Sequence, residues 1–174
     1  MNPARWLYRV RQFWHALIAR PTPQDLAHVQ EILSSEQNRL FLRLQLSEQA
    51  HAILVLKRLE ARGQTHADLL VAALLHDVGK LHHRLMLWER AIIVLGRALF
   101  PDRAKLWGAG AARGWRRPFV IACQHPVWGA DIAGAAGTTD LALEIIRRHQ
   151  DKLAAAETLE EKLILHLQAE DEAS

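Results

Sequence analysis

An adjacent His-Asp pair, His76-Asp77, ends an apolar run and constrains this chain more than any other feature. Residues 69–75 read Leu-Leu-Val-Ala-Ala-Leu-Leu, which is typical of a buried helical stretch. A buried imidazole beside a buried carboxylate is costly unless something compensates both groups. A divalent metal ion compensates both at once. The pair therefore raises the question of whether the rest of the chain supplies further ligands.

The composition favours helix along the whole chain. Half of the 174 residues are hydrophobic, and only six are Pro and nine are Gly, which suits one ordered globular domain with a sizeable core. Leu, Ala, Arg, Glu and Gln are abundant, and all of them form helices readily. We find no convincing strand and no internal repeat. The expected fold class is therefore all-α.

Periodicity and capping residues divide the chain into successive helices. Apolar spacing predicts a helix over 5–20 that ends at Pro21. The Ser34-Ser35 pair is a plausible break within 24–46, and Gly79 permits a sharp exit after the His-Asp pair. The other expected helices cover 48–62 after an N-cap at Ser47, 65–77 from a Thr65–Asp68 capping box, 118–124, 127–136, 139–150 and 158–170.

Charge is distributed unevenly along the chain, although the formal net charge is only +3. Residues 84–118 carry eight Arg and Lys against Glu89 and Asp102, net +6, whereas 151–174 carry seven acids against two Lys, net −5. The basic stretch fits either a solvated helical hairpin or a wall that faces an anionic ligand. Three glycines predict a flexible loop over 107–117.

The sequence favours a reducing compartment, and we expect a cytoplasmic protein. The single cysteine, Cys123, cannot form an internal disulfide. No segment approaches the ~18 uninterrupted apolar residues of a membrane span, and arginines interrupt any signal-peptide core near the N-terminus. The segment 5–20, with its tryptophans and arginines, could lie on an anionic membrane surface, but packing on the domain is the preferred interpretation.

Histidine is frequent, with ten in the chain, and several lie where helices could bring them together with carboxylates. Imidazole nitrogen and carboxylate oxygen suit Fe, Mn, Zn and other transition metals. A lone His on an apolar helix is more often an ordinary hydrogen-bonded residue, so the prediction depends on the whole set and its order. That set is His51, His76, Asp77, His125, His149 and Asp171.

This order resembles the HD-domain metal-dependent phosphohydrolase superfamily, over about Glu48 to Ser174. The run His76-Asp77-Val78-Gly79-Lys80 is the specific part of the resemblance. The segment from His125 to His149 is similar to the His-Pro-x-x-Gly … His block of the two-metal branches, such as the bacterial symmetric diadenosine tetraphosphate hydrolases. The chain departs from the cyclic-di-GMP branch, which has a His pair in place of His149-Gln150.

The resemblance implies an HD core of about five helices within 47–174, with 1–46 as N-terminal helices packed on it and 84–118 as a basic helical insertion. It also implies two divalent transition-metal ions, such as Fe or Mn, that share Asp77. The first would be held by His51, His76, Asp77 and Asp171, and the second by Asp77, His125 and His149.

The implied activity is cleavage of a nucleotide, or of a related phosphoester or phosphoanhydride, by a metal-activated hydroxide. Asp77 and Lys80 would be the catalytic residues. The candidates for binding substrate phosphate are Lys80, Arg84, Arg113, Arg116 and Arg117.

A catalytically inactive HD-fold module that binds a nucleotide or regulates a partner is the alternative. The expected partner in either case is a small-molecule phosphate compound. Specific nucleic-acid binding is not expected, because the chain has no RNP motif, Gly-rich RNA loop or zinc knuckle. The sequence leaves the oligomeric state open.

Overall fold

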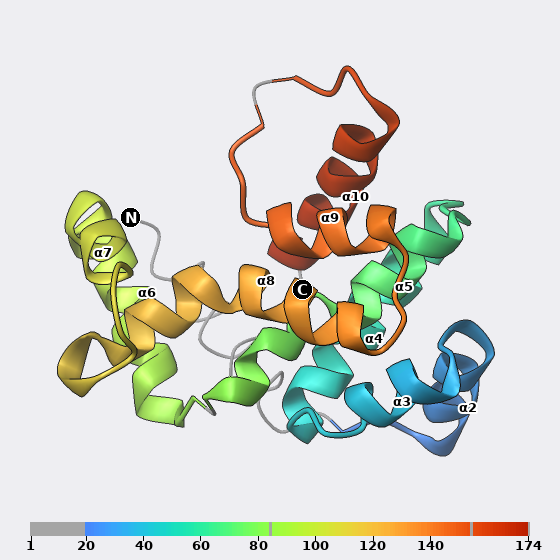
Figure 1. The fold of residues 1–174 in the computed structure, drawn as a ribbon, viewed down its shortest axis with the longest axis horizontal. Helices are drawn as coiled ribbons and strands as arrows, with labels where there is room; N and C mark the ends of the chain where they lie inside the picture. Colours follow the sequence, from blue (N-terminus) through green and yellow to red (C-terminus); the bar gives the residue numbers. More distant parts are fainter. Residues whose placement is uncertain (1–19, 84, 154, 174) are drawn as a thin grey trace, which may run out of the picture.

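A computed structural model describes residues 20–83, 85–153 and 155–173, and Figure 1 shows their arrangement. Throughout these ranges the regular structure is helical, which confirms the all-α prediction. The helix expected over 5–20 and the candidate residue Arg84 lie outside the described residues. None of the described helices is long and apolar enough to cross a membrane.

The described elements follow one another along the chain with short connections. In order they are α2 (Pro23–Ile32), α3 (Ser35–Phe41), α4 (Leu46–Ala61), α5 (Ala67–Leu75), the 3-10 helix η1 (Val78–His82), α6 (Leu87–Leu99), α7 (Pro101–Trp107), the 3-10 helix η2 (Gly114–Arg116), α8 (Arg117–Ala135), α9 (Asp140–Arg148) and α10 (Leu159–Ala173).

Local capping explains several of these boundaries. The predicted break at Ser34-Ser35 is confirmed, since Ser34 caps α3 and accepts a hydrogen bond from the backbone N–H of Gln37 at 3.3 Å. The predicted N-cap at Ser47 is wrong. The Glu48 carboxylate accepts a hydrogen bond from the Gln45 backbone N–H at 3.3 Å, so α4 begins earlier, at Leu46.

The expected Thr65–Asp68 capping box is also wrong, because α5 begins after His66 as N-cap. The Asp68 carboxylate accepts a hydrogen bond from the Thr139 hydroxyl instead, which ties α5 to the start of α9. The Asp68 side chain, which the local sequence pattern assigned to helix capping, therefore makes a tertiary hydrogen bond instead.

One hydrophobic core joins the two ends of the described chain. The α2–α3 pair contributes Val29 and Phe41, which are fully buried in the same cluster as the apolar faces of the later helices. The largest fully buried aliphatic side chains of those later helices are Leu56, Leu59, Leu69, Leu74, Leu75, Ile145, Ile146, Ile164 and Leu167.

The long helix α8 runs through Pro126 without interruption, so the two separate helices expected over 118–124 and 127–136 are wrong. A proline inside a helix has no N–H and leaves the carbonyl four residues earlier without its partner. Here that carbonyl belongs to Ala122, and it accepts a hydrogen bond from Arg97 Nη2 of α6 at 3.1 Å. The insertion thus supplies the bond that the proline removes.

The backbones of η1 and α8 touch at Gly79. A Cβ atom added there would lie 1.9 Å from the His125 carbonyl oxygen and 2.7 Å from the Gly129 nitrogen. The expected sharp exit is absent, because Gly79 continues into η1. The glycine is needed for close approach, and that approach places Asp77 beside His125.

Residues 85–116 pack on the first half of α8. A small second cluster joins Leu85 and Ile93 to Ile121 and Ala122. The glycine-rich connection expected to be a flexible loop is tied down by Gln124, whose Nε2 donates to the carbonyls at 108 and 110 at 3.1 and 3.0 Å.

Replacing Gly79 by Ala should force η1 away from α8 and destabilise the protein by at least about 3 kcal/mol. Gly134→Ala is the matched control, because its Cβ would make only an ordinary contact with the Leu143 side chain. That control should be neutral or stabilising by up to about 1 kcal/mol, since Ala is the better helix former. Urea unfolding followed by circular dichroism measures both, and equal stabilities would contradict the close approach.

Candidate metal centre

All six candidate ligands converge between the ends of four helices and the middle of α8. His76 follows the last residue of α5, Asp77 precedes η1, and His149 follows the last residue of α9. His51 of α4 reaches Asp171 of α10, 120 residues away in the chain, and its Nε2 lies 2.8 Å from Asp171 Oδ1. The sixth candidate, His125, projects from α8.

Three of the histidines are held in one tautomer by their own helices. Each places Nδ1 against a backbone carbonyl three or four residues earlier, and a carbonyl can only accept a hydrogen bond. Nδ1 therefore carries the proton, and Nε2 of the neutral ring presents its lone pair. The pairs are His76 with Ala73 at 2.9 Å, His125 with Ile121 at 3.0 Å and His149 with Ile146 at 2.7 Å.

The Nε2 atoms of these same three rings are buried and make no hydrogen bond. The three side chains are only 1–3% exposed. Their rings meet around a common centre, with centroids 5.1 Å apart for His76 and His149 and 5.2 Å apart for His125 and His149. Buried polar atoms are nearly always paired in folded proteins, so three orphans in one place indicate a missing partner.

Asp77 lies between two groups of possible ligand atoms. One group joins it to His51 and His76, the other to His125 and His149, and within each group the atoms lie within 4.8 Å of one another. Its Oδ1 is 3.2 Å from His125 Nε2, whereas its Oδ2 is 3.7 Å from His76 Nε2. The two oxygens of one carboxylate thus face different histidines.

Asp171 adds a second carboxylate to the first group. Its Oδ1 lies 3.7 Å from His76 Nε2 as well as beside His51. The donor set of histidine nitrogens and carboxylate oxygens fits a divalent transition metal. His/Asp clusters that could hold a metal ion are therefore present, as the sequence predicted.

The electrostatics of the centre keep two histidines ready to bind a cation. Burial, followed by the charges of His76 and His125, lowers the pKa of His149 to about 3. Burial also lowers the pKa of His125, although the Asp77 carboxylate opposes this effect. Both rings are consequently neutral at neutral pH, which is the state that coordinates a metal.

The carboxylates act in the opposite sense on His76. Burial alone would lower its pKa, but the charges of Asp77 and Asp171 outweigh burial and raise that pKa to about 9. Burial would raise the pKa of Asp77, yet Lys80 and then His76 outweigh it and keep that pKa well below its ordinary value. The two carboxylates thus stabilise positive charge at His76, and in the metal-free protein a proton on this histidine supplies that charge.

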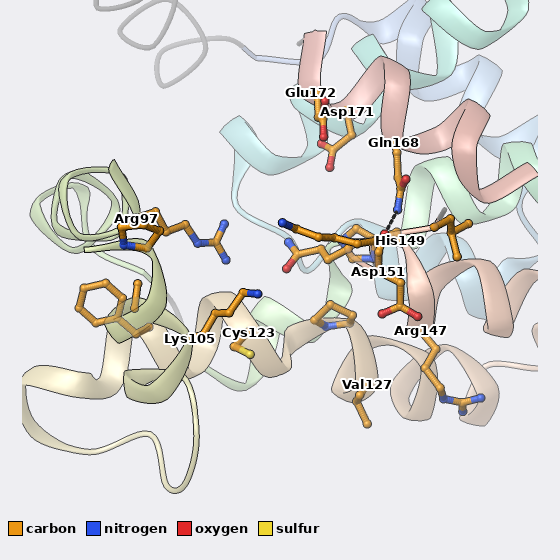
Figure 2. A pocket seen from close by; sticks show the side chains of 17 residues that line it. Arg97, Lys105, Cys123, Val127, Arg147, His149, Asp151, Gln168, Asp171 and Glu172 are labelled. Atoms are coloured by element: carbon orange, nitrogen blue, oxygen red, sulfur yellow. Dashed lines mark hydrogen bonds between the residues drawn. The ribbon is translucent and has the colours of Figure 1, made fainter. Parts of the chain in front are cut away.

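A cavity of about 900 Å³ opens beside this centre (Figure 2). Its lining includes the candidate ligands His149 and Asp171. Arg97 of α6 and Lys105 of α7 reach into it from the opposite wall, facing the end of α9 in Figure 2. Arg147 and Lys152 are the other cations in its lining. The cavity is therefore basic on the side that faces the ligand cluster.

The structure places the sequence-predicted phosphate contacts differently. Arg113, Arg116 and Arg117 are not among the residues that line the cavity. Arg117 pairs with the buried carboxylate of Glu89, and the Arg116 guanidinium lies 5.3 Å from the centre of the Trp115 ring. Lys80 does lie at the centre, with Nζ 2.5 Å from Asp77 Oδ2.

Sequence reasoning did not identify Lys105 and Lys152 as cavity residues, and it did not separate Arg97 from the other arginines of the basic stretch. The net charge of 84–118 indicated a basic insertion, but only the packing of α6 and α7 on α8 decides which cations turn inward. No local signal distinguishes Lys105 from Arg103, two residues earlier on the same helix.

No family model matches the chain, and neither a curated protein nor a solved structure is detectably similar to it. The assignment of the centre therefore depends on its own geometry.

The metal-free protein should lose stability in acid through His149. Its pKa of about 3 lies below the ordinary 6.5, so its contribution is complete above pH 6.5 and is lost progressively as the pH falls towards 3. Between about pH 7 and pH 5 this amounts to about 2 kcal/mol.

His76, whose pKa is raised, contributes in the opposite direction, so the His149 contribution is read from urea unfolding of EDTA-treated wild-type and His149→Gln protein at the two pH values. His149→Gln should show a smaller loss than the wild-type protein. The matched control is His166→Gln, which replaces an exposed histidine of α10 and should behave like wild type. An unchanged pH dependence in His149→Gln would contradict a buried neutral imidazole at this position.

Proposed function

We propose that this chain is a metal-dependent phosphohydrolase of the HD-domain superfamily, with a two-ion centre built around Asp77. One observation carries the proposal: Asp77 belongs to two groups of converging ligand atoms, and beside it His76, His125 and His149 present buried Nε2 atoms that make no hydrogen bond. The order of these residues along the chain, from His51 to Asp171, supports the superfamily assignment.

The first ion would be held by His51, His76 and Asp171, the second by His125 and His149, and Asp77 would contribute to both. When bound, the ions would supply Lewis acidity and a lowered pKa for a coordinated water. The chain's own contribution is to fix the ligands: the Nδ1 bonds to helix carbonyls orient three of the rings.

Lys80 would have two electrostatic roles at the centre, one toward Asp77 and one toward a bound phosphoryl group. Its ammonium group pairs with Asp77 Oδ2, and its charge helps to keep the pKa of Asp77 low, so the carboxylate stays ionised. The side chain is 21% exposed, so it borders the accessible region rather than the core. A phosphoryl oxygen bound at the centre would meet this donor directly.

The cavity supports a nucleotide-sized substrate. Its volume of about 900 Å³ lies within the range of small-molecule sites, roughly 300–1,000 Å³. Arg97 and Lys105 on the wall opposite the ligand cluster would bind phosphate groups other than the one that reacts. This replaces Arg113, Arg116 and Arg117 as the proposed phosphate contacts of the insertion.

The alternative is an inactive module that binds a nucleotide in the same cavity. The cations that line the cavity serve this alternative equally well, whereas three orphaned Nε2 atoms favour a metal centre. Metal content and hydrolysis distinguish the two functions.

Protein purified without chelator should contain about two equivalents of a divalent transition metal. Asp77→Ala should lose both ions and all hydrolysis, because it removes the only ligand common to the two groups. The matched control is Asp131→Ala, which removes an exposed carboxylate of α8 and should keep both.

Inductively coupled plasma mass spectrometry and a nucleotide screen that begins with diadenosine tetraphosphate provide the readouts. Full metal content and activity in Asp77→Ala would refute the centre. Nucleotide binding without metal or turnover would establish the inactive module instead.

Lys105→Ala should raise KM for the best nucleotide about tenfold and leave kcat nearly unchanged, since it removes a charge-assisted contact remote from the ions. Lys105 is a cleaner probe than Arg97, which also holds the Ala122 carbonyl. Arg103→Ala removes the same charge from the same helix outside the cavity and should leave KM within about twofold. Equal KM values for the two variants would contradict phosphate binding by Lys105.

A further inference from the structure

Helix α6 turns Glu89 and Arg90 inward and most of its large apolar residues outward. Glu89 is only 2% exposed and pairs with Arg117, while Arg90 Nη2 donates to Glu48 Oε1 of α4 at 2.9 Å. Arg97 reaches the Ala122 carbonyl. The solvent side of α6 instead carries side chains that are 38–66% exposed, namely Trp88, Ile92, Val94, Leu95 and Leu99.

Four of these side chains form one stripe. Trp88, Ile92, Leu95 and Leu99 follow the i, i+4, i+7, i+11 spacing that places residues on a single helix face. Helix α6 has no other charged residue, so nothing on the helix interrupts the stripe. Within the described part of the chain these side chains stay exposed, and an exposed apolar helix face of this kind marks an interaction surface.

Further large apolar side chains are exposed in the residues that follow α6. Phe100, Leu106 and Trp115 are 49–71% exposed, and ring contacts link Phe100 to Trp107 at 6.2 Å and Trp107 to Trp115 at 5.2 Å. We call the outward stripe of α6 together with Phe100, Leu106 and Trp115 the α6–α7 apolar face.

The segment that carries this face also carries exposed cations. Arg103, Arg113 and Arg116 are all exposed, and in 85–118 only Asp102 remains as an exposed acid, because Glu89 is buried against Arg117. Arg116 lies directly over the ring of Trp115. The surface thus combines aromatic and aliphatic side chains with a net positive charge.

This charge decides between the possible occupants. Two copies docked through the α6–α7 apolar face would bring like charges together, which costs energy. An anionic bilayer surface attracts the same arginines and takes up the apolar side chains, and tryptophan is favoured at that boundary. Asp151, Asp171 and Glu172 of the acidic stretch lie across the cavity from Arg97 and Lys105 of α6 and α7, so opposite charges are separated within the molecule and would help to orient it at an anionic surface.

We propose that the α6–α7 apolar face binds to the surface of an anionic lipid bilayer, with α6 lying in the plane of the interface. None of the described helices is long and apolar enough to cross a membrane, and this mode of binding requires α6 to bury only its apolar side in the bilayer surface. The proposal is independent of the metal centre.

The test is co-sedimentation of the full-length protein with sucrose-loaded vesicles, either pure phosphatidylcholine or phosphatidylcholine mixed with phosphatidylglycerol. Wild-type protein should bind the mixed vesicles and bind the neutral ones much less. Trp88→Ser/Leu95→Ser should weaken binding at least about tenfold, because it removes two large side chains from the interface. Their exposure makes loss of folding unexpected, and circular dichroism checks it.

Matched controls distinguish binding through this face from non-specific hydrophobic adsorption and from an effect of net charge. Leu42→Ser/Leu54→Ser removes two exposed leucines of the α3–α4 region and should leave binding within about twofold. Arg113→Glu/Arg116→Glu should abolish the preference for phosphatidylglycerol, whereas the same reversal at the exposed Arg39 and Arg43 should weaken it less.

Three results would overturn the proposal. The first is absence of binding to the mixed vesicles. The second is equal behaviour of the Trp88→Ser/Leu95→Ser protein and its leucine control, which would place any binding elsewhere, for example in residues 1–19. The third is a dimer, seen by light scattering without vesicles, that Trp88→Ser/Leu95→Ser dissociates, which would make the face a contact between copies.

Discussion

Burial of the Asp77 carboxylate among histidines is the interaction on which the rest of the structure depends. The carboxylate is 3% exposed, and its oxygens face His76 on one side and His125 on the other. Such a cluster, with three unpartnered Nε2 atoms around it, is unfavourable as a hydrophobic core. A cation would supply the missing partner, so the cluster makes physical sense as a binding centre.

The helices are arranged so that this centre can exist. Gly79 lets the η1 backbone touch α8, which places Asp77 against His125. Pro126 would break α8 one residue after that histidine, but Arg97 of the insertion restores the lost hydrogen bond at Ala122. The insertion thus supports a ligand-bearing helix and also forms one wall of the cavity. Arg97 therefore has two roles: it supports the helix that carries His125, and it lines the cavity proposed to bind substrate.

Helical character and the candidate ligands could be predicted from local sequence, because periodicity, capping and an ordered set of His and Asp residues are visible there. What escaped prediction depends on contacts distant in sequence. The Ala122 carbonyl left free by Pro126 in α8 is bonded by Arg97, and the Asp68 side chain near the start of α5 is bonded by Thr139, the N-cap of α9. Which cations line the cavity depends on the packing of α6 and α7, so Lys105 could not be told from its neighbours.

The most direct test of the central claim is the position of bound metal, read from anomalous diffraction of crystals grown with Mn²⁺. The account predicts two peaks, each within about 2.2 Å of a different Asp77 oxygen, one adjoining His51 and His76 and the other adjoining His125 and His149. A single peak that leaves His125 and His149 without a metal would contradict a shared carboxylate. Absence of any peak at Asp77 would contradict the metal centre itself.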